Sequence, residues 1–184
     1  KDLEQAREQL ADAREKLEEL ADRMEESVNA KKAPDVRKAA DAAARVAPEL
    51  ANARLCASLL FADDAEVHVL NHEWRGKDKP TNVLSFPMLE REDLLDLAAD
   101  GPPELLGDIA LALETCGREA AEKGVPLEHH AAHLIVHGLL HLAGHDHETS
   151  PEDADAMEAL EIKALALLGI ADPYGDRGIS EEYE

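Results

Sequence analysis

The chain of 184 residues has only two cysteines, Cys56 and Cys116, and neither belongs to a CxxC pair. A disulfide framework is therefore excluded, and the spacing does not indicate a cysteine metal site. We expect both to be buried free thiols, which behave as small apolar side chains. Unpaired thiols make a reducing cytoplasm the default location.

Long apolar runs and aromatic residues are also scarce. No run approaches the ~20 apolar residues that a membrane-spanning helix requires, and the charged N-terminus does not resemble a signal peptide. Hydrophobic residues make up 45% of the chain but aromatic ones only 3%. We therefore expect no membrane association and a sizeable core of Ala, Leu, Val and Ile.

Basic residues are few: 19 Lys and Arg face 41 Asp and Glu, a net charge of −22. Such a surface repels phosphates, which counts against general nucleic-acid binding. Three of the basic residues nevertheless lie together, at Arg75, Lys77 and Lys79. They form either a local phosphate-binding spot or a solvated loop, and charge alone leaves both open.

Residues 2–28 are predicted to form one helix with an apolar seam in alternating steps of three and four. About three to four heptads make a marginal coiled coil alone. The seam must pack on the body of the protein, on a second helix or on another copy, so self-association through this helix is one of three outcomes. We expect residues 1–32 to be an N-terminal helical extension, whether fused, designed or lineage-specific, and residues 33–184 to form the functional domain.

The rest of the chain predicts an α+β fold, a small mixed β-sheet packed with several helices. Acidic residues and a Gly-Pro-Pro sequence predict an exposed, mobile loop over 89–104. The expected helices cover 35–47, 65–74, 114–123, 127–142 and 152–168, and the expected strands cover 55–61, 83–86 and 107–113.

The strongest chemical signal is the spacing HxxxHxxGxxH, formed by His137, His141, Gly144 and His147. Two histidines four apart project from one face of a helix, and a glycine that tolerates positive φ can turn the chain so that the third returns to the same ion. Three neutral nitrogens leave a fourth position for water, as in catalytic zinc sites. Zinc lowers the pKa of such water from ~16 towards ~7.

Two further histidines lie close to this pattern. His133 is one turn before His137 on the same face, where it could support a ligand, contact substrate or simply lie in the core. His145 is a rival ligand to His147, although it would approach the ion at a different angle.

The glutamate of the metalloprotease pattern HExxH is missing, because Gly138 occupies its position. A peptidase would lack its usual proton acceptor. Attack on a phosphodiester needs less help from a carboxylate if a cation stabilises the anionic transition state. Arg75 is our candidate for that cation, because its planar guanidinium matches the oxygens of a phosphate.

Two segments of the sequence resemble the motifs of a known family. RGKDKPTNVLSFP at residues 75–87 and HGLLHLAGHDH at 137–147 are similar to the two signatures of the YbeY family. Members are bacterial single-strand-specific endoribonucleases and rRNA maturation factors. The segments LLGDIALA and MEALEIKALALLGIADPY also resemble the family, so the similarity runs from about residue 55 to residue 174.

The resemblance implies a zincin-like fold, loosely akin to that of metalloproteases. It also implies one zinc ion held by His137, His141 and His147, and a functional arginine at Arg75. It further implies a role at the three-prime end of 16S rRNA and in ribosome quality control, with the small ribosomal subunit as partner. The chain departs from the family by having no evident strand before residue 55 and by having His145 where tyrosine is common.

Two hypotheses follow. In the first, the protein is a zinc-dependent endoribonuclease of the cytoplasm in which Arg75 clamps the phosphate, Lys77, Lys79 and His133 contact single-stranded RNA, and residues 75–107 form one wall of the cleft. In the second, it is a metal-stabilised ribosome-assembly adaptor with little intrinsic hydrolysis. A metzincin-like peptidase is a third alternative, and hydrolysis of peptides after Gly138→Glu would reveal that ancestry.

Overall fold

The computed structural model of the protein describes residues 34–175. The helix predicted over residues 2–28 and the extension over 1–32 lie outside this range. The elements, in chain order, are α2 (Val36–Val46), η2 (Pro48–Ala51), β1 (Leu55–Ala62), α3 (Asp64–Arg75), β2 (Val83–Pro87), α4 (Arg91–Leu95), β3 (Glu104–Ala112), α5 (Leu113–Lys123), α6 (Leu127–Leu142) and α7 (Pro151–Leu167).

The sheet of the described residues has three strands in the order β1-β3-β2. β1 pairs with β3 in parallel, and β2 pairs with β3 antiparallel. The predicted α+β fold with a small mixed sheet is therefore confirmed. β3 is the central strand, and its continuous apolar run, Ile109 to Ala112, is buried on both faces of the sheet.

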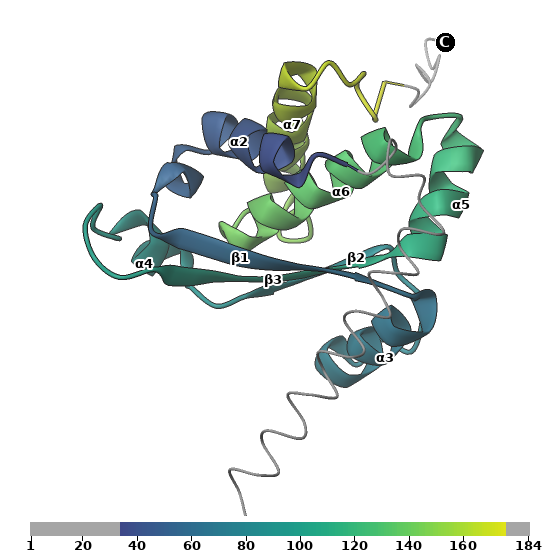
Figure 1. Ribbon diagram of the computed structural model, residues 1–184, viewed down its shortest axis with the longest axis horizontal. Helices are drawn as coiled ribbons and strands as arrows, with labels where there is room; N and C mark the ends of the chain where they lie inside the picture. Colours follow the sequence, from purple (N-terminus) through teal and green to yellow (C-terminus); the bar gives the residue numbers. More distant parts are fainter. Residues whose placement is uncertain (1–33, 176–184) are drawn as a thin grey trace, which may run out of the picture. The chain divides into compact units, whose positions relative to one another are not determined.

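Helices cover both faces of this sheet (Figure 1). On one face, Ile109 and Leu111 of β3 belong to the main core, which α2, α6 and α7 complete. On the other face, Ala110 and Ala112 pack with Val67 of α3. Successive residues of β3 thus point to opposite cores, as the period of a strand requires.

Most element bounds agree with the sequence prediction to within one to three residues. Helix α6 begins and ends as predicted. Asp63 caps α3: its side chain accepts from the backbone N–H of Glu66, whose carboxylate accepts in return from the N–H of Asp63. Such reciprocal capping explains why the helix begins there.

Most residues of the segment 89–104 are exposed, as predicted, but the segment is not a loop throughout. It contains the short helix α4, and Leu94 is buried in the main core. The carbonyls of Leu97 and Ala98 accept hydrogen bonds from Asn52, which ties the following turn to the body of the protein. The acidic composition of the segment gave no sign that one of its leucines is buried in the core.

The prediction of two buried thiols is correct for Cys116 and wrong for Cys56, and both are free. Cys116 lies in the main core, where burial raises the pKa of its thiol to about 12. Cys56 is exposed because β1 is an edge strand of the described sheet. Among residues 34–175, no helix is long and apolar enough to cross a membrane.

Candidate metal centre

Helix α6 presents its histidines as one stripe. His130, His133, His137 and His141 recur in steps of three and four, the spacing of one helix face. His130 and His133 are buried, whereas His137 and His141 are half-buried near the C-terminal end of the helix. The last two turns of α6 therefore bring imidazoles from the core to the surface.

The chain turns back at Gly144, which adopts a left-handed φ of +87°. The backbone N–H of His145 donates to the carbonyl of Leu140 at 3.0 Å, closing the helix end. Arg91 of α4 packs so closely that a Cβ on Gly144 would lie 2.8 Å from its side chain. The Arg91 guanidinium also donates to the carbonyl of Ala143 at 2.6 Å. Contacts from Arg91 of α4 thus hold the turn after α6 in place.

This turn brings His147 beside His137 and His141. The ring centroids lie 4.6 Å (137 to 141), 5.2 Å (137 to 147) and 4.9 Å (141 to 147) apart. One nitrogen from each ring lies within 4.8 Å of the other two. The Nε2 atoms of His137 and His141 are 3.1 Å apart, close to the roughly 3.3 Å that two nitrogens would show on a tetrahedral ion bound at ~2.0–2.1 Å.

The electrostatics of these rings suit a cation. Burial, together with the neighbouring His137 and His147, lowers the pKa of His141 to about 4. The imidazole of His141 is therefore neutral at physiological pH, the form that binds metals. The donor set and its spacing fit a single transition-metal ion.

The rival ligand His145 lies elsewhere. Its Nε2 atom is 2.9 Å from the Oε1 atom of Glu49, which also accepts from Arg91 at 3.0 Å. Burial would raise the pKa of Glu49, but hydrogen bonds from its own backbone, His145 and Arg91 lower it below its usual range. His145 lines the same cleft as the three rings, but it and Arg91 contact one carboxylate, that of Glu49.

His133 lies behind the triad rather than in front of it. It is 8% exposed, and its Nε2 atom is 2.8 Å from a carboxylate oxygen of Glu161, which is 1% exposed. The other oxygen of Glu161 is 2.6 Å from Nδ1 of His137. This placement favours a supporting role for His133 over contact with substrate.

The three rings line a cleft of about 510 Å³, and the basic residues Arg75, Lys77 and Lys79 line the same cleft. Arg75 is the last residue of α3, and Lys77 and Lys79 follow in the loop before β2. All three are exposed. The wall runs from Asn71 to Pro87, and no described residue between 88 and 107 lines the cleft. The predicted wall over 75–107 is thus correct only in its first part.

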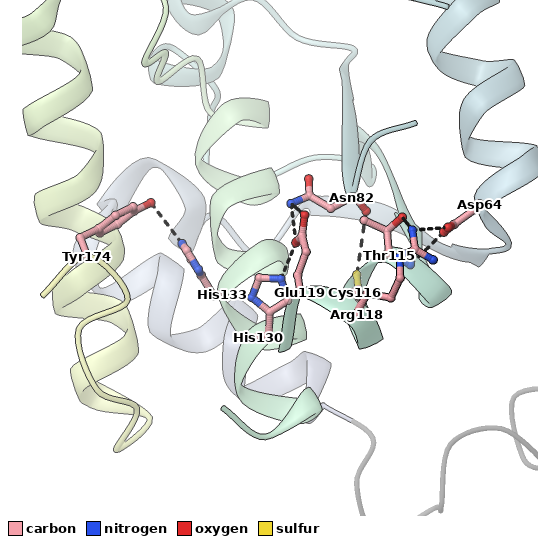
Figure 2. Close-up of polar contacts among 9 residues, drawn as sticks. All are labelled: Asp64, Asn82, Thr115, Cys116, Arg118, Glu119, His130, His133 and Tyr174. Carbon is pink, nitrogen blue, oxygen red and sulfur yellow. Dashed lines mark hydrogen bonds and ion pairs between the residues drawn. The ribbon is translucent and has the colours of Figure 1, made fainter. Parts of the chain in front are cut away.

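Contacts of two asparagines, the buried Asn71 and the half-buried Asn82, hold the basic loop in place. The Asn71 side chain donates to the carbonyl of Lys79 at 2.7 Å. At the end of the loop, the Asn82 amide donates to both carboxylate oxygens of Glu119, which in turn lies 2.7 Å from Nε2 of His130 (Figure 2). A chain of polar contacts therefore links α6 to the start of β2 across α5.

Gly138, which occupies the position of the glutamate in the HExxH pattern, is closely packed against the sheet. A Cβ at this position would lie 3.0 Å from a methyl group of Ile109 and 3.2 Å from the hydroxyl of Ser85. Helix α6 approaches the sheet closely at this residue, so a side chain there would require Ile109 and Ser85 to shift.

The sequence analysis did not identify Glu161, Glu49, Arg91, Asn71 or Asn82. For Glu161 a signal existed: it shares the buried stripe of α7 with Met157, Ala164 and Leu165. A carboxylate within an apolar stripe requires buried partners. The other four residues depend on contacts between distant segments, which local sequence does not reveal.

The fold and the site define a class of protein: a small α+β protein whose three histidines could hold one metal ion in a cleft with a basic wall. Comparison with known proteins identifies the family. The model of the family described as "Endoribonuclease YbeY" matches residues 7–169, which is most of the chain. The chain belongs to this family.

Individual relatives agree. The chain is 70% identical over 139 residues to an endoribonuclease YbeY of Erythrobacter litoralis, covering 76% of this chain and 86% of the relative. It is 66% identical over 138 residues to that of Novosphingobium aromaticivorans, covering 74% and 83%. A solution structure of a Thermotoga maritima protein is 23% identical, with a TM-score of 0.49, and the match covers 72% of this chain and 80% of that one.

Proposed function

We propose that this protein is a zinc-dependent endoribonuclease that cuts single-stranded RNA, and that it acts in three-prime-end maturation of 16S rRNA and in ribosome quality control. The observation that carries the proposal is that the three histidines and the basic loop line one cleft. Family membership, and the names of relatives up to 70% identical, supply the RNA substrate.

The proposed role of each residue follows from its position at the cleft. His137, His141 and His147 would hold zinc, which when bound supplies a hydroxide at neutral pH. Arg75 would bind a non-bridging pair of phosphate oxygens with its planar guanidinium and stabilise the charge that develops there. Lys77 and Lys79, on the same wall, would hold the neighbouring phosphates. His133 would act from behind the triad.

The test of Arg75 is its replacement by alanine. Arg75→Ala should lose at least about a hundredfold in cleavage rate, as expected for loss of a group that stabilises transition-state charge. Its zinc content should remain at the parent value. Arg45→Ala, which removes an exposed arginine from α2, is the matched control and should leave cleavage unchanged. Undiminished cleavage by Arg75→Ala would remove Arg75 from the mechanism.

The alternative is a metal-stabilised adaptor for ribosome assembly with little hydrolysis. Two observations favour this alternative. Gly138 stands where the HExxH pattern has its carboxylate, at a closely packed position, and the net charge of the chain is −22. A variant with both His137 and His141 replaced by alanine separates the two. Retained binding to small ribosomal subunits, with no cleavage by the parent even after zinc is added, favours the adaptor.

The setting follows from this function. A protein that matures 16S rRNA works in the cytoplasm with the small ribosomal subunit as its partner. The division into an extension over residues 1–32 and a functional domain over 33–184 remains part of this proposal, as does self-association through the extension. The extension itself lies outside the described range.

A further inference from the structure

Glu161 is a buried carboxylate in the middle of the last long helix, α7. It is 1% exposed and lies on the apolar stripe that packs against the core. An ionised carboxylate in such a place requires several hydrogen-bond donors to replace water. The structure supplies three.

The donors come from two segments. From α6, Nδ1 of His137 lies 2.6 Å from Oε1 of Glu161, and Nε2 of His133 lies 2.8 Å from Oε2. From the segment after α7, the hydroxyl of Tyr174 donates to Oε2. Tyr174 is also 3.2 Å from Nε2 of His133, a contact drawn in Figure 2. Both oxygens of the carboxylate are thus occupied.

These contacts determine where the protons lie. An ionised carboxylate only accepts, so the Nδ1 atom of His137 must carry a hydrogen. The Nε2 atom of His137 is then a bare lone pair in the neutral ring. It points toward Nε2 of His141, 3.1 Å away, where the three rings converge.

The same reasoning applies to His133. Its Nε2 atom donates to Glu161, and its Nδ1 atom is buried without a partner among the described residues. A buried bare acceptor costs less than a buried N–H without an acceptor. His133 is therefore a donor whose ring holds Glu161 in place.

We infer that Glu161 is a positioning residue for the metal centre: it fixes the orientation and tautomer of His137 and places a negative charge 2.6 Å behind a ligand ring, with His133 and Tyr174 holding it in place. The inference rests on the proposed function, because it requires that the three histidines bind a metal. Hydrogen bonding by a carboxylate makes an imidazole more basic, and loss of such a partner typically weakens metal affinity 10–100-fold.

The experiment measures zinc affinity by competition with a chromophoric chelator, using the full-length protein and zinc alone. Glu161→Gln keeps the shape of the side chain and removes its charge, and it should bind zinc 10–100-fold more weakly than the parent. Asp155→Asn, which neutralises an exposed carboxylate on the same helix, is the matched control and should bind as the parent does. The visible spectrum of the cobalt-substituted protein should change in Glu161→Gln alone.

Tyr174→Phe keeps the test decisive if Glu161→Gln does not fold. It removes one donor to the carboxylate and leaves the ring, so it should weaken zinc binding by a smaller factor than Glu161→Gln. Parent affinity in Glu161→Gln, or in Tyr174→Phe where only that variant folds, overturns the inference. The inference is also overturned if Glu161→Gln is less stable than the parent without metal but binds zinc with parent affinity. That result would mean that Glu161 serves the core and not the metal centre.

The inference and the proposed function fail in different ways. A parent protein that binds zinc, with His147→Ala unable to do so, supports the metal centre whatever the result at Glu161. A parent protein that binds no zinc overturns the metal centre and, with it, the role of Glu161.

Discussion

Gly138 and Gly144 lie six residues apart at the end of α6, and each is required for a different reason. Gly138 lets the helix approach Ile109 and Ser85 of the sheet, and Gly144 lets the chain leave the helix with a φ of +87°. The sequence predicted the second role from the histidine spacing. It did not predict the first, because close approach of a helix to a sheet is a property of the tertiary structure.

Replacing Gly138 should therefore destabilise the protein without creating a peptidase. Gly138→Glu forces atoms against Ile109 and Ser85, which we expect to cost about 1–3 kcal/mol of unfolding free energy. Gly117→Glu is the matched control, because a Cβ there meets nothing within 4 Å in the middle of α5. Urea unfolding measures the difference, and a casein assay tests for peptidase activity. A stable, proteolytic Gly138→Glu protein would refute this account.

At the scale of secondary-structure elements, periodicity was sufficient where one helix carries the chemistry. The spacing of His137 and His141 in α6 follows from the helix itself, so the triad could be proposed before the structure. The supports come from elsewhere: Arg91 from α4, Glu49 from η2 and Glu161 from α7. Glu161 is 24 residues from its partner His137 in the sequence, and Glu49 is 96 residues from its partner His145. No local pattern records such pairs.

The turn after α6 is the element on which His147 depends, and Gly144→Ala tests it. Alanine at a left-handed φ is strained, typically by 1–2 kcal/mol, and its methyl group would also meet Arg91. Gly124→Ala is the control, since Gly124 has a φ of +65° and a Cβ there meets nothing within 4 Å. Calorimetry should show a larger loss of stability for Gly144→Ala, and only this variant should bind zinc more weakly. Equal effects in both would show that Arg91 does not fix the turn.

At the scale of the whole molecule, charge is distributed unevenly, and the net charge does not show this. The net charge of −22 argues against binding RNA, but Arg75, Lys77 and Lys79 gather on one wall of the cleft that holds the triad. Their closeness to one another could be predicted from the sequence, but only the fold shows that they line the same cleft as the histidines. An acidic protein with one basic wall should bind phosphates there and repel them elsewhere.

The salt dependence of RNA binding measures this arrangement. Each phosphate contact on a single strand contributes about −0.7 to the slope of log K against log salt, so three contacts predict a slope of about −2. Lys77→Gln and Lys79→Gln should each reduce its magnitude by about 0.7. Lys38→Gln, an exposed lysine on α2, should not. A slope several times steeper, unchanged by substitutions in the loop, would mean that RNA binds elsewhere.

The central claim is that three imidazoles share one metal ion. The measurement that tests it most directly is an anomalous difference map at the zinc edge from crystals of the purified protein. The account predicts one peak, about 2.0–2.1 Å from a nitrogen of each of His137, His141 and His147. The absence of a peak after zinc is supplied, or a peak bound by His145 in place of His147, would contradict it.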